Sequence, residues 1–350
     1  MTGSDFFYKD GNMKGLLRYA VTRILLTIPM IFILLTIVFL VLRVMPGDPV
    51  SAMLGAHAPE RVIEEKKEEL GLNKPIAVQY FNYLVQIAHF DLGESMVLKQ
   101  KVSEPIREKL PATIELTLLG MFFTLLIGVP LGAYSANKRR TGRDFAIRLY
   151  GNVAYCIPVF WMGLMLQLIF GVWLGWLPIA GRTSARILSS QFSKTGFYLI
   201  DTLLAGNLRA FGDVAVHLLL PSLTLGIVLS GIFVRLTRAN MLDVLKSDYI
   251  LAARARGVSE KFVVYKHGLK NAFIPILTML GLQFAILLAG AVLTETTFSW
   301  PGIGRLLMER IYLRDYPTVQ GVIVVFALLV SVISLLVDLL YAFIDPRVKY

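Results

Sequence analysis

Residues 248–275 read DYILAARARGVSEKFVVYKHGLKNAFIP, a polar, basic and helix-prone stretch. Two long apolar runs border it, at residues 218–234 and 272–294. A helix of about 20 apolar residues is long enough to cross the hydrocarbon core of a bilayer. The stretch is therefore predicted to be an internal polar loop between two membrane spans.

The composition of the whole chain supports a membrane setting. Of its 350 residues, 56% are hydrophobic and 17% are charged, whereas soluble domains carry about 25% charged residues. The single cysteine, Cys156, lies in an apolar run and excludes an intrachain disulfide or a thiolate metal cluster.

Charge-free runs long enough to span a bilayer occur six times, at residues 24–42, 116–136, 149–177, 218–234, 272–294 and 319–337. Each run is apolar around its whole circumference, as expected of helices in lipid. The first run follows basic residues like a secretory signal, but it exceeds the 7 to 15 residues of a signal core. The sequence predicts an all-α integral membrane protein with six transmembrane helices.

The distribution of charge predicts the orientation. The spans are assigned to residues 24–42, 112–136, 149–177, 218–236, 272–294 and 318–341. This assignment puts four segments on one side of the membrane, at residues 1–23, 137–148, 237–271 and 342–350. Together with the adjoining span ends, that side holds 19 of the 35 Lys and Arg but only eight of the 24 Asp and Glu. Short basic loops favour the cytoplasm, so both termini are predicted to be cytoplasmic. The net charge of +11 thus reflects orientation rather than nucleic-acid binding.

Three segments are predicted to lie outside, at residues 43–111, 178–217 and 295–317. The first contains an amphipathic stretch at 60–72, followed by large apolar residues at helical spacing, which favour a small ordered subdomain over a floppy connector. Those residues are Tyr80, Phe81, Tyr83, Leu84 and Ile87. The second segment is predicted to be loop with short helical pieces.

The third outer segment combines a turn at residues 299–302 with a short amphipathic helix. Such a helix is expected to lie across the outer mouth and to roof a translocation path. Its apolar side is predicted to carry Leu306, Leu307 and Ile311, and its polar side Arg305, Glu309 and Arg310.

Several kinds of chemistry are excluded by missing motifs. The sequence has no Gly-x-x-x-x-Gly-Lys-Ser/Thr loop for ATP phosphates, no His-Glu-x-x-His and no Gly-x-Ser-x-Gly. Judged against the charge-free runs, the only ionisable candidate is Asp338, near the cytoplasmic end of the sixth run, and we expect it to be hydrated or to pair with a nearby Arg. A secondary carrier or an intramembrane enzyme is disfavoured, because the midplane charges or paired catalytic groups that they need are missing.

The polar loop itself predicts two short helices. Asp248 is expected to cap a helix over residues 249–256, Gly257 to end it and Ser259 to cap the next. The first helix has an alanine face made by Ala252, Ala253 and Ala255. Small side chains let a partner approach closely, whereas a helix lying on lipid headgroups would need large apolar residues there.

The sequence resembles the permease subunits of ABC importers, in their dipeptide/oligopeptide branch. The likeness covers about residues 14–350. It is carried by 249–257 with His267, Asn271, Ala272 and Pro275, and by the motifs at 46–49, 70–72, 79–80, 91–95, 158–181, 217–226, 295–304 and 314–317. Leu251 stands where the general importer motif has Glu, which leaves any contact of that Glu in doubt.

The resemblance implies a type I importer-permease fold in a prokaryotic cell membrane, with an external subdomain and cytoplasmic coupling helices. It also implies as partners a second homologous permease, two cytoplasmic ABC ATPases that bind ATP and Mg²⁺, an external binding protein and the lipid bilayer. This chain would bind no cofactor or nucleic acid, and would be a transport subunit rather than an enzyme. The cargo would be di- or oligopeptides, with oligosaccharides or metal chelates as alternatives.

The resemblance also assigns two groups of site residues. The ATPase coupling site is expected at Asp248, Tyr249, Ala252, Ala253, Arg254, Arg256 and Gly257. The external gate or docking site for the binding protein is expected at Glu295, Phe298, Trp300, Pro301, Gly302, Arg314 and Asp315.

Overall fold

A computed structural model of the chain describes residues 4–44, 50, 59–69, 71–95, 97–184, 187 and 194–344. Over these ranges the structure is helical, and its only β pairing is an isolated bridge between Glu94 and Lys101. Among the described residues, five helices are long and apolar enough to cross a membrane, and a bent pair of helices brings the number to as many as six. The predicted all-α fold class is confirmed.

The five long helices extend beyond the predicted runs, because a helix does not end where the hydrocarbon ends. α9, for example, continues through polar residues on both sides of its apolar centre. The five are α1 (Ser4–Val44), α5 (Ser103–Asn137), α9 (Leu208–Val244), α12 (Leu269–Thr297) and α14 (Tyr316–Ile344).

The third predicted span is not one straight helix. α6 (Gly142–Cys156) and α7 (Val159–Leu166), which continues into the π-helical turn η1 (Gln167–Trp173), meet at an angle of 105°. Pro158 causes the break, since proline has no N–H to donate and forces the preceding residue out of the helical region. Ile157 accordingly has an extended ψ of 126°.

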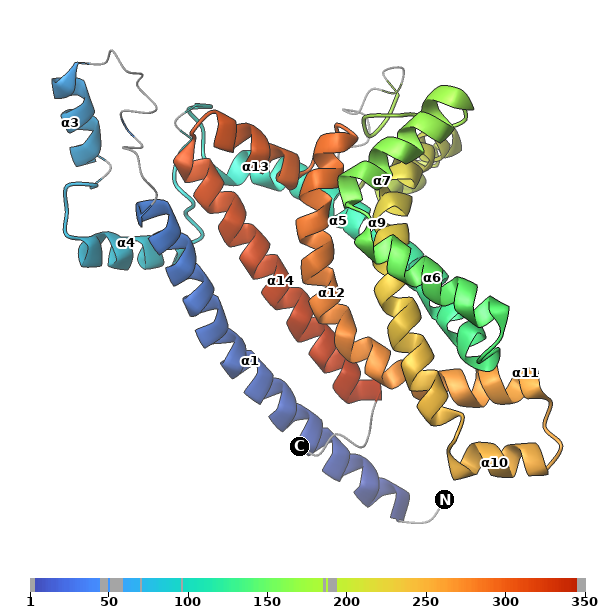
Figure 1. Cartoon of the computed structure of the whole chain (residues 1–350). Helices are drawn as coiled ribbons and strands as arrows, with labels where there is room; N and C mark the ends of the chain where they lie inside the picture. Colours follow the sequence, from blue (N-terminus) through green and yellow to red (C-terminus); the bar gives the residue numbers. More distant parts are fainter. Residues whose placement is uncertain are drawn as a thin grey trace.

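α5 and α9 form the tightly packed centre of the molecule and run in the same direction (Figure 1). A Cβ on Gly128 would lie 2.6 Å from the Cβ of Phe233, and one on Gly132 would lie 2.7 Å from the carbonyl oxygen of Val234. Only glycine allows this approach. Because α5 and α9 are parallel, the chain between them must return along the bundle, and the bent pair, the sixth candidate span, lies in this return.

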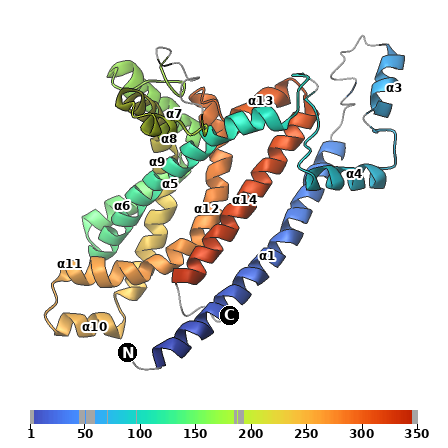
Figure 2. The same ribbon diagram turned by 180° about the vertical axis from the view of Figure 1, so that it is seen from behind.

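The remaining spans are arranged beside this centre. α12 packs on α9 and α14, and α1 packs on α14 at the edge of the molecule (Figures 1 and 2). Large apolar residues of α5, α9 and α12 form the main core. α1 remains mostly exposed, as expected of a helix at the rim of a membrane bundle. Near the middle of α1, Arg23 lies 3.2 Å from Asp338, so this carboxylate takes the Arg pairing that was one of the two outcomes expected for it.

The two ends of the bundle carry different short elements (Figure 1). One end, here the α10 end, carries α10 (Asp248–Ala255) and α11 (Glu260–Phe262), together with the start of α1 and the end of α14. The opposite end, here the α13 end, carries α13 (Ile303–Tyr312), α3 (Glu60–Glu69), α4 (Ile76–Ala88) and α8 (Tyr198–Leu204).

The predicted packing of the first outer segment is confirmed for α4. Tyr80, Tyr83, Leu84 and Ile87 pack against α1 and α14. Phe81 does not, since 66% of it is exposed. It points away because one face of a 13-residue helix cannot hold all five positions. The predicted motif at 46–49 lies outside the described residues.

Candidate functional site

α10 begins one residue earlier than predicted, and Asp248 is not its cap. Ser247 holds the N-cap position with an extended backbone, and no side chain accepts a hydrogen bond there. The Ser247 hydroxyl instead donates to the carbonyl oxygen of Val244 at 2.6 Å. Asp248 is the first helical residue, where its carboxylate lies near the positive end of the helix dipole.

The turn after α10 follows the prediction at Gly257. This residue has a φ of +77°, which side chains resist, and Ser259 takes the N-cap position of α11 without a side-chain cap. Across the turn, Arg254 donates to both carboxylate oxygens of Glu260, at 2.7 and 3.1 Å. These bonds lower the pKa of Glu260 and raise that of Arg254.

One residue anchors α10 to the bundle, and most of the others face outward. Ile250 is fully buried. After the turn that follows α10, α11 continues through the π-helical turn η3 (Val263–Gly268) into α12. In η3, Val264 packs with Met241 and Ala133 from the ends of α9 and α5. The α10 hairpin is therefore continuous with α9 and α12 and rests on α5.

Six of the seven predicted coupling residues are exposed on α10 and the turn after it. Those exposed are Asp248, Tyr249, Ala252, Arg254, Arg256 and Gly257, while Ala253 is half-buried. Tyr249 and Leu251 add two large exposed apolar side chains to the alanine face. A surface with a small-residue centre and a bulky, charged rim can receive a protein partner at short range.

At the α13 end, Glu295 is the buried centre of a polar cluster. Its carboxylate accepts hydrogen bonds from the Thr113 hydroxyl at 2.5 Å and from the Arg305 backbone N–H at 2.8 Å. Thr113 in turn accepts from the backbone N–H of Ile303 at 2.9 Å. The carboxylate thus connects α12, the start of α13 and α5.

Two glycines make room for this carboxylate. A Cβ on Gly302 would collide with the carboxyl group of Glu295, and one on Gly304 would lie 2.7 Å from the Cα of Val292. The start of α13 also presents its positive dipole end to the acidic side chain. The Trp-Pro-Gly-Ile-Gly sequence therefore shapes a cradle for Glu295.

The aromatic residues of this turn are buried rather than displayed. Trp300 is fully buried and donates from Nε1 to the carbonyl oxygen of Ala112 at 2.9 Å. Phe298 packs with Leu166 and Leu220, and its carbonyl oxygen accepts from the backbone N–H of Gly181 at 2.9 Å. Both hold the turn against the bundle.

Asp315 and Arg314, neighbours in sequence, have opposite environments. Asp315 is fully buried and accepts from the hydroxyls of Ser95 and Thr318 at 2.5 and 2.7 Å. Arg314 is exposed, with a φ of +55°. Pro301 is half-buried. On the predicted apolar side of α13, Ile311 is exposed, because the helix rests on the bundle through Ile303 and Leu306 near its start.

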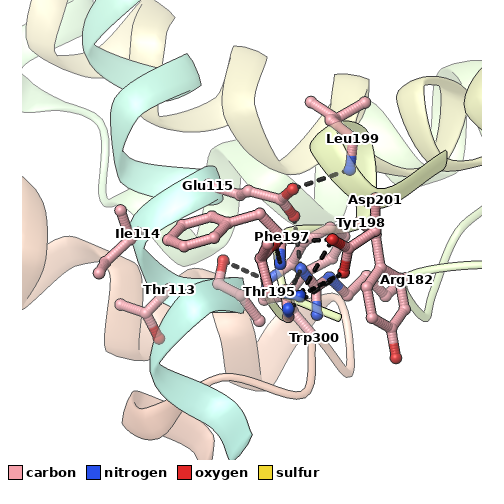
Figure 3. Close-up of polar contacts among 12 residues, drawn as sticks. Thr113, Ile114, Glu115, Arg182, Thr195, Phe197, Tyr198, Leu199, Asp201 and Trp300 are labelled. Carbon is pink, nitrogen blue, oxygen red and sulfur yellow. Dashed lines mark hydrogen bonds and ion pairs between the residues drawn. The ribbon is translucent and has the colours of Figure 1, made fainter. Parts of the chain in front are cut away.

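A buried ion pair at the same end was missed by the sequence reasoning (Figure 3). Arg182 lies 2.6 Å from the carboxylate of Glu115 and 2.7 Å from the carbonyl oxygen of Gly196, with both charged side chains 6% exposed. Its guanidinium carbon sits 3.6 Å from the centre of the Tyr198 ring. The pair fastens the 178–217 segment to α5, beside Trp300.

A second carboxylate orders the same segment. Asp201 accepts from the backbone N–H groups of Thr195 and Gly196 and from the Thr195 hydroxyl, at 2.7 to 3.1 Å. The Leu199 N–H donates to Glu115 at 2.9 Å. No motif signalled these contacts, because they join residues more than 60 positions apart or lie in an irregular loop.

Together these features define a polytopic helical membrane protein with an exposed helical hairpin at one end and a clamped turn at the other. Residues 128–350 match the family described as binding-protein-dependent transport system inner membrane component, and residues 16–117 match its N-terminal component. The chain belongs to this family of ABC importer permeases.

Named relatives align along nearly the whole chain. It is 44% identical to the dipeptide transport system permease protein DppB of Alkalihalophilus pseudofirmus, over 96% of the chain and 100% of that protein. It is 42% identical to the di/tripeptide permease DppB of Pseudomonas aeruginosa, over 96% and 99%. It is also 38% identical to the glutathione permease GsiC of Pectobacterium atrosepticum, over 96% and 100%.

Proposed function

We propose that this chain forms half of the translocation path of an ATP-driven importer for dipeptides and short peptides. The identity of 44% to a dipeptide permease over that protein's full length is the observation that carries the proposal. A second permease would form the other half of the path, and an external binding protein would deliver the cargo. Two ABC ATPases would bind ATP and Mg²⁺, in keeping with the missing phosphate loop.

In this proposal the α10 surface docks on an ATPase subunit. Closure of the ATPases around ATP would move α10, and the movement would reach the spans because α10 is anchored at Ile250 and is followed by α11, η3 and α12. The α10 end would face the cytoplasm with both termini, as the positive-inside distribution of Lys and Arg supports.

The α13 end would then face the outside. The clamped turn with Glu295, Phe298, Trp300 and Gly302 would form part of the outer gate. Among the residues predicted there, exposed Arg314 and half-buried Pro301 would be the ones able to touch a binding protein.

Reconstitution tests the function as a whole. The chain is purified with its second permease and ATPases, placed in proteoliposomes and supplied with binding protein. Uptake of a labelled dipeptide is compared with that of glutathione, an oligosaccharide and a metal chelate. We expect ATP-dependent uptake of the dipeptide.

The matched control uses the same proteoliposomes with an ATPase variant that cannot hydrolyse ATP. Dipeptide uptake that persists with this variant and follows an ion gradient would identify a secondary carrier. If only the oligosaccharide or the chelate is taken up in an ATP-dependent way, the chain is still part of an ATP-driven importer, but the proposed peptide cargo is wrong.

A further inference from the structure

α4 lies in the segment that the sequence assigned to the outside, yet its composition suits lipid. Its 13 residues, IAVQYFNYLVQIA, contain no charged side chain. The neighbouring α3 is the opposite, since eight of its ten residues in ERVIEEKKEE are charged. The two helices of one segment are therefore suited to different surroundings.

The contacts of α4 show where it sits along α1. Tyr80 shares a hydrogen bond of 2.5 Å with the Thr36 hydroxyl, and its ring centre lies 5.2 Å from that of Phe39. Tyr83 lies 5.5 Å from Phe39, measured between ring centres. These partners belong to the apolar run at residues 24–42, not to the polar segment after it.

The depth follows from helix geometry. Arg43 ends the apolar run, and at 1.5 Å per residue Phe39 lies about 6 Å and Thr36 about 10 Å before it along α1. Helices that lie in a membrane interface are buried by about 5–10 Å. Figure 1 shows α4 crossing the upper turns of α1, below the level of α13.

The side of α4 that faces away from α1 carries an apolar stripe, bordered by the exposed uncharged side chains of Asn82 and Gln86. Val78, Phe81 and Val85 are exposed and recur at the spacing of one helix face. In water, such a face would be an unfavourable apolar patch; among acyl chains it would be solvated. Charged residues resume on both sides, at Lys74 and Asp91.

We infer that α4 is an interfacial helix embedded in the leaflet at the α13 end, with Val78, Phe81 and Val85 in contact with lipid acyl chains. Its other face clamps α1 through Thr36 and Phe39. The chain therefore dips back into the membrane at α4 before it reaches α5, and the charged α3 remains in water.

Site-directed spin labelling in the assembled complex tests this inference. Phe81→Cys is introduced into a Cys156→Ser background, labelled with a nitroxide and studied in nanodiscs of phosphatidylcholine and phosphatidylglycerol. Collision rates with oxygen, which concentrates in lipid, are compared with those of a water-soluble nickel chelate. Matched exposed positions are Leu26→Cys on α1 and Val62→Cys on α3.

We expect the label at Phe81 to collide preferentially with oxygen, as at Leu26, and the label at Val62 to collide preferentially with the chelate. A label at Phe81 that meets the chelate as readily as Val62 does would place α4 in water and overturn the inference. Shielding from both reagents would mean that a protein partner covers the face, and would overturn it equally. Val85→Cys repeats the measurement on the same face if the Phe81 variant does not assemble.

Discussion

The α10 end and the α13 end use their polar residues in opposite ways. On α10, the residues singled out by the sequence are mostly exposed, and Ile250 is the buried anchor. At the α13 end, Glu295, Trp300, Gly302 and Asp315 are buried and closely contacted. The α10 end therefore presents exposed side chains to a partner, whereas the buried polar groups at the α13 end hold the turn before α13 in one conformation.

This difference separates two roles that one motif could have. A docking residue must reach its partner, so it has to be exposed. A carboxylate such as Glu295, satisfied by Thr113 and Arg305, positions the turn instead. We therefore expect substitutions at the α13 end to affect stability first, and those on α10 to affect coupling first.

The largest effect is expected at the buried ion pair. Arg182→Met leaves the Glu115 carboxylate without its cation, and breaking a buried pair costs about 3–5 kcal/mol. The folded protein should melt at a markedly lower temperature, measured by fluorescence-detected gel filtration after heating.

The control for this prediction is the double variant Arg182→Met with Glu115→Gln. The glutamine oxygen still accepts the Leu199 N–H but carries no buried charge, so stability should partly return. If the single and double variants melt together, the charge of Glu115 is not the cause of the loss.

The second effect concerns the exposed surface of α10. Ala252→Trp puts a large side chain on the alanine face, and inserting bulk into a packed contact costs about 1–3 kcal/mol. Since 1.4 kcal/mol corresponds to tenfold, we expect about a tenfold loss of ATP-dependent uptake at an unchanged melting temperature. Ala252→Ser, which stays small, should transport normally; full uptake by the tryptophan variant would remove α10 from the coupling contact.

A third, smaller effect is expected at the Glu295 cradle. Glu295→Ala leaves the Thr113 hydroxyl and the Arg305 N–H without their acceptor, at about 1–3 kcal/mol for a buried unsatisfied group. Glu295→Gln keeps an oxygen for one donor and an amide that can donate to Thr113. The melting temperatures should rank wild type, Gln and Ala in descending order, and equal values for Gln and Ala would contradict a hydrogen-bonding role.

The fold was largely predictable from the sequence because hydrocarbon imposes a simple rule. Runs of uncharged residues located all five long spans. The glycine at position 257 predicted the end of α10, and its φ is positive in the structure. The ion pair at Asp338 also followed, since a charge near a span end needs a partner or water.

What the sequence did not predict depends on contacts between distant residues. Many membrane spans tolerate proline without a break, as Pro221 inside α9 shows. Predicting the bend at Pro158 would require knowing that no neighbouring group replaces the missing hydrogen bond there. Arg182 reaches Glu115 across 67 positions, and neither residue lies in a recognisable pattern. Asp248 was misassigned as a cap because Ser247, also a good cap residue, precedes it.

The smallest expected effect is a pH dependence of the α10 turn. Arg254 lowers the pKa of Glu260, so the pair stabilises the turn above the ordinary glutamate pKa of about 4.3 and stops doing so as pH falls through the lowered value. Both side chains are partly exposed, at 37% and 51%, which limits the pair to less than about 1 kcal/mol.

Hydrogen exchange of the α10 amides, compared between wild type and Glu260→Gln at each pH, isolates this contribution. At pH 7 the wild type should be protected up to about fivefold more, and as pH falls below the lowered pKa of Glu260 the two should converge, because protonated glutamate then resembles glutamine. High salt should shrink the difference at pH 7. A difference in protection that persists at low pH would mean that packing of the Glu260 side chain, not its charge, stabilises the turn. Identical protection at pH 7 would mean that the ion pair contributes nothing and that the turn is held by the backbone of Gly257 and the burial of Ile250.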